Sequence, residues 1–174
     1  MKLQKLISKL EKHHKKKLDL SLGRTFNLLK KLGDPQDKLK NVITVVGTNA
    51  KASMCYSLKS ILNQGGYKTN LYTSPHLLSY TERYIFDDKE INEEDLIELL
   101  TDVEKTLGDD NATLFEILTC AFLKYAENFK DNVNIIEAGL FHQFDSTNVF
   151  KENLMTLIGV IHNDHFQWLE NKSI

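Results

Sequence analysis

The sequence predicts an α/β protein: a P-loop-type, doubly wound, mostly parallel sheet flanked by helices. Short apolar runs that suit buried strands alternate with longer segments of helical periodicity. One of these runs, at 42–46, leads directly into the turn 47–53 and then into a helical segment. The length of 174 residues, with 41% hydrophobic and 26% charged residues, fits one soluble globular domain with its own core.

The first forty residues are strongly basic. They hold 12 Lys and Arg against 4 Asp and Glu, although the net charge of the whole chain is −2. Residues 1–17 are predicted as a Lys-rich helix with an apolar face formed by Leu3, Leu6, Ile7 and Leu10. Such a segment would suit nucleic acid or an anionic membrane surface. No aromatic residues interleave with the lysines to stack on bases, which favours a solvated helix docked by its leucine face.

The cysteines and the hydropathy pattern indicate an intracellular protein. Cys55 and Cys120 lack CxxC spacing and fall in predicted helices, which favours buried, reduced thiols. No stretch approaches the roughly 18 consecutive apolar residues of a membrane helix. No apolar signal core opens the chain. We therefore expect a cytoplasmic protein with no membrane partner.

The first half of the chain is predicted to hold two helices and two strands around the turn. The helix over 18–36 ends at Gly33, with Pro35 beyond it. The helix after the turn ends at Gly65-Gly66, and the second strand is broken by a proline at once. In order, the elements are helix 18–36, strand 42–46, turn 47–53, helix 53–63 with Met54, Leu58, Ile61 and Leu62 inward, and strand 68–73.

The second half begins with a short hairpin around residues 87–89. Asn92 is a good N-cap for the next helix, and Thr113 with Glu116 forms a capping box that opens a strongly apolar one. Because that second helix is apolar over a wide face, we expect it to be buried against the sheet. The remaining predicted elements are helix 92–107, a helix from 113 to about 125, strand 133–136 and strand 154–161.

The turn 47–53 has the composition of a loop that cradles a triphosphate. In such loops backbone N–H groups and the helix N-terminus bind phosphate oxygens, a lysine neutralises charge and a hydroxyl ligates Mg²⁺. Lys51 and Ser53 occupy these places. The pattern is incomplete because Ala50 stands where a P-loop has Gly before its Lys. An ordinary βα turn with a surface lysine stays an alternative.

Polar groups also follow two other predicted strands. Glu137 ends the strand at 133–136, and Asp164 and His165 follow the strand at 154–161. In a parallel sheet these strand ends meet Gly47 at one edge, where α/β proteins gather ligands. A carboxylate there also suits the Mg²⁺ of a P-loop. On these residues alone, a neighbouring helix N-terminus would satisfy Glu137 equally well, and His165 would serve as a surface or capping residue.

Several ordered motifs together resemble one family. The spacing is similar to that of the N-terminal, ATP-binding domain of folylpolyglutamate synthase/dihydrofolate synthase, in the Mur ligase superfamily. The resemblance runs from about Leu18 over nearly the whole remaining chain. It rests on Gly47-Thr48-Asn49-x-Lys51-x-Ser53, Tyr72-Thr73-Ser74-Pro75-His76-Leu77, Glu82-Arg83, Thr113-x-Phe115-Glu116, Glu137-x-Gly139-Leu140, Asp145-x-Thr147-Asn148 and Asp164-His165.

The resemblance implies an ATP-dependent amide ligase. ATP phosphorylates a carboxylate of dihydropteroate or a folate, and the amine of L-glutamate attacks the acyl phosphate. The family roles transfer to catalytic residues Lys51, Glu137 and His165, and to metal ligands Ser53, Glu137 and His165 for Mg²⁺ and a second divalent ion. They also imply nucleotide-binding residues Gly47, Thr48, Asn49, Ala50, Lys51, Ala52 and Ser53, and pterin-site residues Thr73, Ser74, Pro75 and His76.

Departures from the family pattern limit what this chain alone should do. Ala50 and Ala52 replace glycines, and Phe141-His142-Gln143-Phe144 replaces a Gly-Gly-Arg turn. Residues 18–174 are thus expected to be an incomplete Mur-ligase-like domain, without the family's later lysine and C-terminal domain, which we expect as a missing partner. A degenerate binding or interaction protein is the main alternative, and a small P-loop phosphotransferase is a third.

Overall fold

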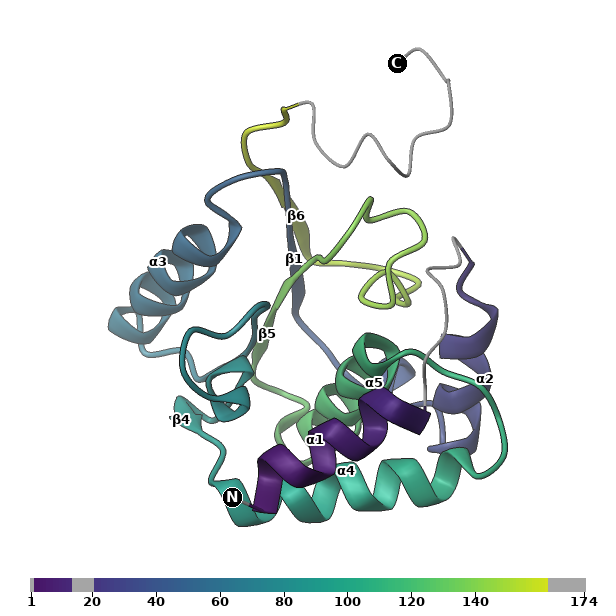
Figure 1. Cartoon of the computed structure of the whole chain (residues 1–174). Helices are drawn as coiled ribbons and strands as arrows, with labels where there is room; N and C mark the ends of the chain where they lie inside the picture. Colours follow the sequence, from purple (N-terminus) through teal and green to yellow (C-terminus); the bar gives the residue numbers. More distant parts are fainter. Residues whose placement is uncertain (1, 14–20, 163–174) are drawn as a thin grey trace.

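A computed structural model describes residues 2–13 and 21–162 of the chain, built around one twisted sheet (Figure 1). Its six strands lie in the order β4-β3-β2-β5-β1-β6. Strands β2, β5, β1 and β6 are parallel, and β3 and β4 form an antiparallel hairpin at one edge. The strands are β1 (Val42–Val46), β2 (Thr69–Tyr72), β3 (Tyr84–Phe86), β4 (Lys89–Glu90), β5 (Val133–Glu137) and β6 (Met155–Ile158).

Helices lie on both faces of this sheet, which confirms the predicted fold class. Helix α3 covers one face, and the other long helices gather on the opposite face (Figure 1). The described α-helices are α1 (Lys2–His13), α2 (Gly23–Lys31), α3 (Lys51–Gln64), α4 (Glu93–Leu107) and α5 (Leu114–Ala126), and the short 3-10 turns are η1 (Pro35–Asp37), η2 (Tyr80–Arg83) and η3 (Glu127–Phe129). No helix among the described residues is long and apolar enough to cross a membrane.

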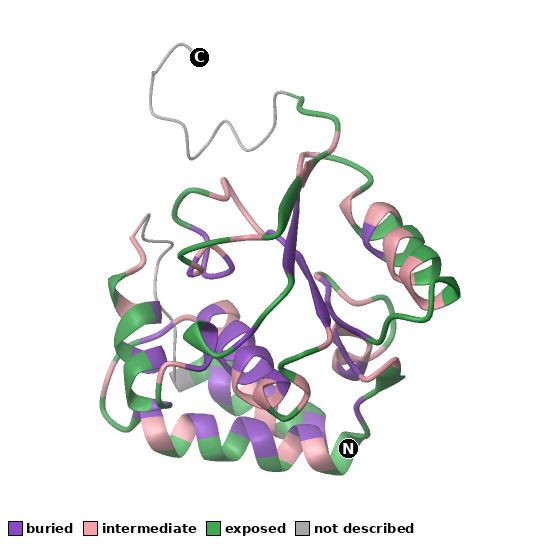
Figure 2. Cartoon of the chain, turned by 180° about the vertical axis from the view of Figure 1, so that it is seen from behind, coloured by how far each residue is buried: buried purple, intermediate pink, exposed green. Residues whose placement is uncertain are grey.

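The main core lies between the sheet and α5. The rings of Tyr72, Tyr84 and Phe122 are fully buried there, and the centroids of Tyr72 and Phe122 are 5.0 Å apart. Helix α5 is buried over most of its length, as its wide apolar face predicts (Figure 2). This layer fixes the ends of β2 and β5 relative to each other.

Helix α1 joins the same core. Leu3, Ile7 and Leu10 are buried, and the helix packs against α4 while its lysines point to solvent. Lys9 Nζ, for example, pairs with Glu104 Oε2 at 2.8 Å. The predicted docking through the leucine face is therefore confirmed.

The core under α3 is much smaller. Cys55 is its only fully buried helix residue, and Leu58 and Leu62 pack partly against the sheet. Ile61 was expected on this inner face, but it is 68% exposed. The inward stripe runs through Cys55, Leu58 and Leu62, and Ile61 lies beside this stripe on the solvent side.

Two predicted elements prove shorter. Helix α2 ends at Lys31 because Gly33 and Asp34 take positive φ values of 86° and 53°, which turn the chain into η1; residues 18–20 of its predicted start lie outside the described residues. Strand β6 covers only Met155–Ile158. Cys55 and Cys120 are buried and unpaired, as predicted.

Candidate functional site

The turn between β1 and α3 forms the centre of the candidate site. Gly47 has a φ of +140°, and a Cβ there would lie 3.1 Å from the backbone of Gly159. Ala50 is the N-cap of α3 and has φ 63° and ψ 8°, in the left-handed region. A side chain in this region costs roughly 1–2 kcal/mol relative to glycine. The turn thus keeps a glycine-type conformation although Ala50 carries a Cβ.

Lys51 bends back over this turn. Its Nζ donates to the carbonyl oxygen of Gly47 at 2.9 Å, and a longer contact of 3.4 Å reaches the carbonyl oxygen of Thr48. The ammonium is therefore held at the mouth of the turn, next to the N-terminus of α3. Anions are stabilised at such a position by the N–H groups of the first helical turn and by the lysine charge.

Glu137 stands at the end of β5, opposite Val45 of β1. Its carboxylate is buried, and Oε2 accepts the backbone N–H of Ser74 at 3.0 Å. Burial raises the pKa of Glu137 above the ordinary glutamate value, opposed by the Ser74 hydrogen bond and the charge of Lys51. The fold thus brings Lys51 and Glu137 to the same sheet edge, where sequence reasoning placed them.

The loop after β2 lies beside this carboxylate. Thr73 is buried and donates its N–H to the carbonyl oxygen of Arg83 at 3.2 Å. The peptide bond between Ser74 and Pro75 is cis. His76 Nδ1 accepts from Arg83 Nε at 3.0 Å, and its ring packs against Tyr80 in a tilted arrangement with centroids 4.1 Å apart. Partial burial, together with the Arg83 charge, lowers the pKa of His76.

Glu82 organises the tip of the same loop, a role that the sequence analysis did not assign. Its carboxylate accepts the N–H groups of Leu77, Leu78 and Ser79 at 2.8, 2.8 and 2.7 Å. These bonds hold the pKa of Glu82 below its usual value. The leucine side chains point away and are 92% and 93% exposed. The Ser79-x-x-Glu82 capping box was the signal that could have revealed this role.

A second turn, after β5, is held by Asp145. Asp145 Oδ2 accepts the N–H of Leu140 at 2.9 Å, and Oδ1 accepts the N–H of Thr147 at 3.0 Å. A Cβ at Gly139 would collide with this carboxylate and would lie 2.9 Å from the ring of Phe115. Asp145 belongs to a motif noted in the sequence, but its turn-forming role emerges only from the structure.

Phe141 and His142 occupy this turn with positive φ values of 53° and 34°. Bulky residues rarely adopt such angles, so the turn retains a backbone that glycines would take without strain. His142 Nδ1 is buried with no hydrogen-bond partner among the described residues. Two large side chains therefore occupy a turn whose backbone angles suit glycine.

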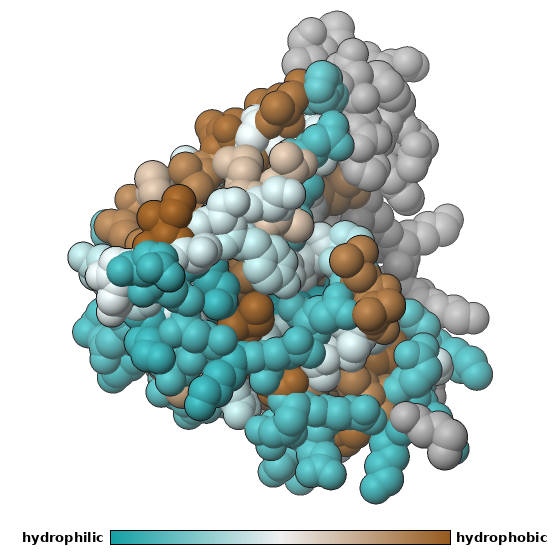
Figure 3. Space-filling model, turned by 90° about the vertical axis from the view of Figure 1, so that its left-hand side faces the viewer, coloured by the Kyte–Doolittle hydropathy of each residue, from teal (hydrophilic) through white to brown (hydrophobic). Residues whose placement is uncertain are grey.

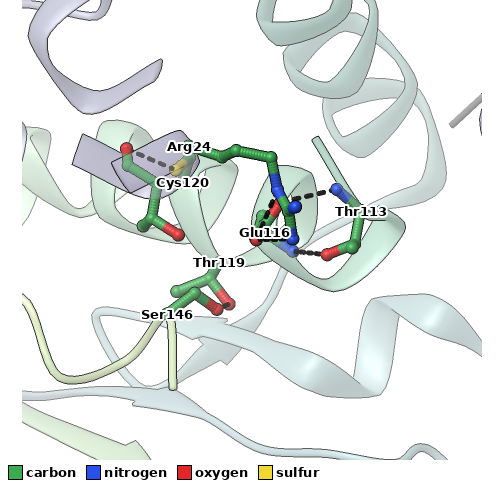
Figure 4. Close-up of polar contacts among 7 residues, drawn as sticks. Arg24, Thr113, Glu116, Thr119, Cys120 and Ser146 are labelled. Carbon is green, nitrogen blue, oxygen red and sulfur yellow. Dashed lines mark hydrogen bonds and ion pairs between the residues drawn. The ribbon is translucent and has the colours of Figure 1, made fainter. Parts of the chain in front are cut away.

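The N-terminus of α5 is braced by an ion pair with Arg24 of α2 (Figure 4). Arg24 Nη2 lies 2.9 Å from Glu116 Oε1, and Glu116 also completes the predicted capping box with Thr113. The box was predicted from local sequence. The Arg24 contact was not, because 92 residues separate the partners.

Nearby, three buried hydroxyls join the layers. Thr119 Oγ1 lies 3.2 Å from the Tyr72 hydroxyl. Ser146 Oγ donates to Thr119 Oγ1 at 3.1 Å (Figure 4). Thr119 thereby connects β2, α5 and the turn held by Asp145. The two loops that flank Glu137 are thus fixed to a common helix.

Of the remaining predicted metal ligands, Ser53 is among the described residues and His165 is not. Ser53 is exposed in the first turn of α3. His165 and Asp164 lie outside the described residues. Within residues 2–13 and 21–162, no three His, Cys, Asp or Glu side chains cluster closely enough to hold a metal ion by themselves. A metal at Glu137 and Ser53 would therefore draw its other ligands from a bound phosphate or from water.

No protein-family model matches the sequence. Individual proteins match it well. The dihydrofolate synthase/folylpolyglutamate synthase of Escherichia coli K12 is 35% identical over 163 residues, which are 94% of this chain and 38% of that protein. The Bacillus subtilis protein of the same name is 36% identical over 157 residues, covering 86% of this chain and 36% of the relative.

Solved structures give the same result. E. coli FolC in complex with DHPP and ADP superposes with a TM-score of 0.89 at 35% identity, covering 98% of this chain and 41% of FolC. The Yersinia pestis bifunctional enzyme with AMPPNP and Mn ion gives 0.87 at 32% identity, with coverage of 98% and 41%. The chain thus spans about two fifths of its relatives. By sequence and by fold it is similar to the N-terminal part of the dihydrofolate synthase/folylpolyglutamate synthases.

Proposed function

We propose that this chain provides the ATP-binding part of a cytoplasmic ligase that adds L-glutamate to dihydropteroate or a folate. The observation that carries the proposal is the placement of Lys51 and Glu137 at one edge of the sheet, around a turn that begins a helix. In the proposed reaction ATP phosphorylates the acceptor carboxylate, and the amine of glutamate displaces phosphate from the acyl phosphate.

The residues present fit Mg·ATP. Lys51 Nζ sits at the helix N-terminus and can exchange its contacts with the Gly47 and Thr48 carbonyl oxygens for phosphate oxygens. Glu137 Oε2 is engaged by Ser74, and Oε1 has no hydrogen bond from the described residues. Carboxylate, hydroxyl and phosphate oxygens are the ligands that Mg²⁺ prefers. When bound, Mg²⁺ would supply charge stabilisation for the transferred phosphoryl group.

The solved relatives support this assignment. E. coli FolC was determined with DHPP and ADP, and the Y. pestis enzyme with AMPPNP and a manganese ion. A further structure of a bifunctional folylpolyglutamate synthase/dihydrofolate synthase holds Mn, AMPPNP and L-glutamate. We assign residues 47–53 to the nucleotide, with Lys51 holding the phosphates and Ser53 and Glu137 holding the metal. We assign 73–76 to the pterin side, because Ser74 is bonded directly to Glu137.

His165 remains proposed as a ligand of a second divalent ion. Residues 18–174 are proposed as one part of a Mur-ligase-type domain, preceded by the Lys-rich N-terminal helix of residues 1–17. The remaining three fifths of the relatives' length is proposed to supply the other parts of the ATP and glutamate sites.

A second candidate is a protein of the same fold that has lost catalysis. It is favoured by the left-handed backbone at Ala50, and by Phe141 and His142 in a turn that suits glycines. Each of these positions holds a Cβ that crowds or strains a turn bordering the proposed site. Such a protein would keep its core and its loop geometry but bind nucleotide weakly.

Calorimetric titration with Mg·ATP separates the two candidates. The ligase proposal expects saturable binding that Lys51→Met weakens at least about tenfold, since a charged phosphate contact is lost. Lys59→Met, on the same helix, is the matched control and should leave affinity unchanged. Absence of binding at millimolar nucleotide would favour the non-catalytic protein. Phosphate release that depends on dihydropteroate and glutamate, measured after joining the chain to the remaining part of a relative, tests the reaction itself.

A further inference from the structure

Arg83 is a charged residue that the proposed roles leave unused. It ends η2, immediately before strand β3. The chain has two arginines, and the other, Arg24, is held in the ion pair at the start of α5. Arg83 makes no such pair within the described residues: its Nε donates to His76 Nδ1, and neither Nη atom has a hydrogen-bond or ion-pair partner there. The N–H groups of both Nη atoms are thus available to a ligand.

Two rings fix the direction of this guanidinium. His76 Nδ1 accepts the Nε–H over 3.0 Å, and Arg83 Cζ lies 4.9 Å from the centroid of the Tyr80 ring. The His76 ring packs on Tyr80 in turn. His76 can accept this bond only while its ring is neutral, and its lowered pKa favours the neutral form. With Nε and one face occupied, the guanidinium presents its two Nη atoms as a fork.

The tip of the loop does not cover this fork. Leu77 and Leu78 are 92% and 93% exposed, so their side chains stand in solvent, and Figure 3 shows apolar groups open to solvent on the α3 side of the molecule. The tip is held in this position by its N–H bonds to Glu82. A small anion can therefore reach Arg83 without displacing an apolar side chain.

The sheet places Arg83 and Lys51 on opposite sides of Glu137. The strands run in the order β3-β2-β5-β1. Arg83 precedes β3 and its carbonyl oxygen accepts the N–H of Thr73 after β2, whereas Lys51 follows β1. Neighbouring strands lie about 4.8 Å apart, so two strand spacings put the backbone of Arg83 about 10 Å from that of Glu137. Both cations act on this carboxylate, because each lowers its pKa against the effect of burial.

These side chains also share the face of the sheet that α3 covers. The core under α3 contains one residue from each of β2, β3 and β5: Leu71, Ile85 and Ile135. Thr73, Arg83 and Glu137 lie two positions nearer the carboxyl edge, and alternate residues of a strand share a face. Glu137 is therefore flanked by Lys51 with the helix N-terminus at one end and by a guanidinium beside the proposed pterin loop at the other.

We propose that the Nη atoms of Arg83 bind the carboxylate of the acceptor substrate, and that His76 and Tyr80 are positioning residues that aim the guanidinium. The inference rests on the proposed function and names the group that holds the acceptor. A carboxylate matches the guanidinium fork in shape and charge. A cation on the acceptor side also offsets the repulsion between this carboxylate and the triphosphate.

In the proposed reaction Arg83 forms no covalent bond and transfers no proton. One carboxylate oxygen forms the bond to the γ-phosphorus, while the bond from that phosphorus to ADP breaks and its electron pair leaves with ADP. Arg83 stays on the other carboxylate oxygen. A nucleotide phosphate is the other anion that suits a guanidinium, but Lys51 lies beyond Glu137, about three strand spacings or 14 Å from Arg83 along the sheet. The acceptor beside residues 73–76 is closer.

Calorimetric titration of the full chain tests the contact. Dihydropteroate is compared with its carboxamide, in which a neutral amide replaces the carboxylate. Arg83→Met should weaken dihydropteroate binding at least about tenfold, but leave the affinities for the carboxamide and for Mg·ATP within about twofold, because only the ion pair is lost. Lys89→Met removes an exposed positive charge from the same hairpin and is the control that should change none of these affinities. Melting temperatures confirm that the variants are folded.

The positioning role of His76 has its own readout. His76→Leu removes the acceptor of Arg83 Nε and should weaken dihydropteroate binding at least about threefold without changing carboxamide binding. His76→Asn supplies a side-chain oxygen as acceptor and should recover most of the loss. Equal losses for both compounds in His76→Leu would contradict a role that acts through Arg83.

NMR of the guanidinium nitrogens gives a measurement that depends on neither pterin nor nucleotide. Binding of 4-aminobenzoate should shift the Arg83 Nη signals, whereas 4-aminobenzamide should not, and Arg24 is the internal reference. Unmoved Arg83 signals would overturn the proposal. Equal losses for dihydropteroate and its carboxamide in Arg83→Met, or a loss of Mg·ATP affinity alone, would also overturn it. Shifted Arg83 signals in a chain that binds no Mg·ATP would instead contradict the proposed function and leave the carboxylate contact standing.

Discussion

The backbone N–H of Ser74 donates to the buried carboxylate of Glu137 over 3.0 Å. This bond ties the loop after β2 to the end of β5, so the proposed substrate and metal residues form one unit. The carboxylate is nevertheless costly to bury, because its pKa is raised by desolvation and only partly restored by Ser74 and Lys51. A stability cost at the centre of the site is what a ligand-binding carboxylate would show.

Glu137→Gln should therefore separate stability from binding. A carboxyl with a raised folded-state pKa gives stability at low pH and loses it as pH rises through that pKa. The amide removes this loss, so the free energy of unfolding at neutral pH should increase, while Mg·ATP affinity falls by about 10- to 100-fold. Urea denaturation and calorimetry measure the two effects. Glu90→Gln, at an exposed strand position, is the control. A lower free energy of unfolding in Glu137→Gln would contradict the conclusion that burying the Glu137 carboxylate costs stability.

Substituting glycine for the two alanines of the phosphate loop should change the stability of the protein in opposite directions. Ala50 has a φ of 63°, so Ala50→Gly should stabilise the protein by about 1 kcal/mol. Ala52 lies in the first turn of α3, where glycine should cost up to about 1 kcal/mol. Denaturant titrations give both values. If the site binds nucleotide, Ala50→Gly should also raise Mg·ATP affinity; unchanged affinity would indicate an abandoned pocket.

The Arg24–Glu116 pair should be worth far more than the surface pairs. Glu116 has a side chain only 8% exposed, so Arg24→Met leaves a poorly solvated carboxylate and should destabilise by about 3 kcal/mol. Lys40→Met breaks the ion pair between Lys40 and Asp131, whose two side chains are 66% and 70% exposed respectively. This change should lower the free energy of unfolding by at most about 1 kcal/mol. Equal losses of stability in the two variants would show that the capping-box hydrogen bonds with Thr113 are enough to stabilise the buried Glu116 carboxylate.

The loop held by Glu82 should lose its order in acid. The pKa of Glu82 is lowered mainly by the N–H groups of Leu77 and Ser79, so its contribution is complete above the ordinary glutamate pKa and disappears as pH falls through the lowered value. Amide exchange at residues 77–79 should accelerate in that range, after correction for intrinsic rates. Glu82→Gln should show fast exchange at all pH values. If amide exchange at residues 77–79 does not depend on pH in the protein that retains Glu82, this role of the carboxylate is excluded.

The sequence determined the order and type of the main elements. Alternating apolar runs and helical periodicity gave β1 at its observed bounds, and the capping residues Asn92 and Thr113 marked the starts of α4 and α5. The ordered motifs also indicated the relatives to which the chain is similar. These signals are local, or repeat along the chain, and therefore survive without knowledge of the tertiary contacts.

Only the tertiary structure decided how distant residues meet. The Arg24–Glu116 pair, the Ser74–Glu137 bond and the hydroxyl cluster at Thr119 join positions separated by 27 to 92 residues. The exposure of Ile61 depends equally on what packs outside α3. Local sequence fixes the periodicity of a helix or strand, but the partner that a side chain finds is set by the packing of the layers, and so the candidate site became visible only in three dimensions.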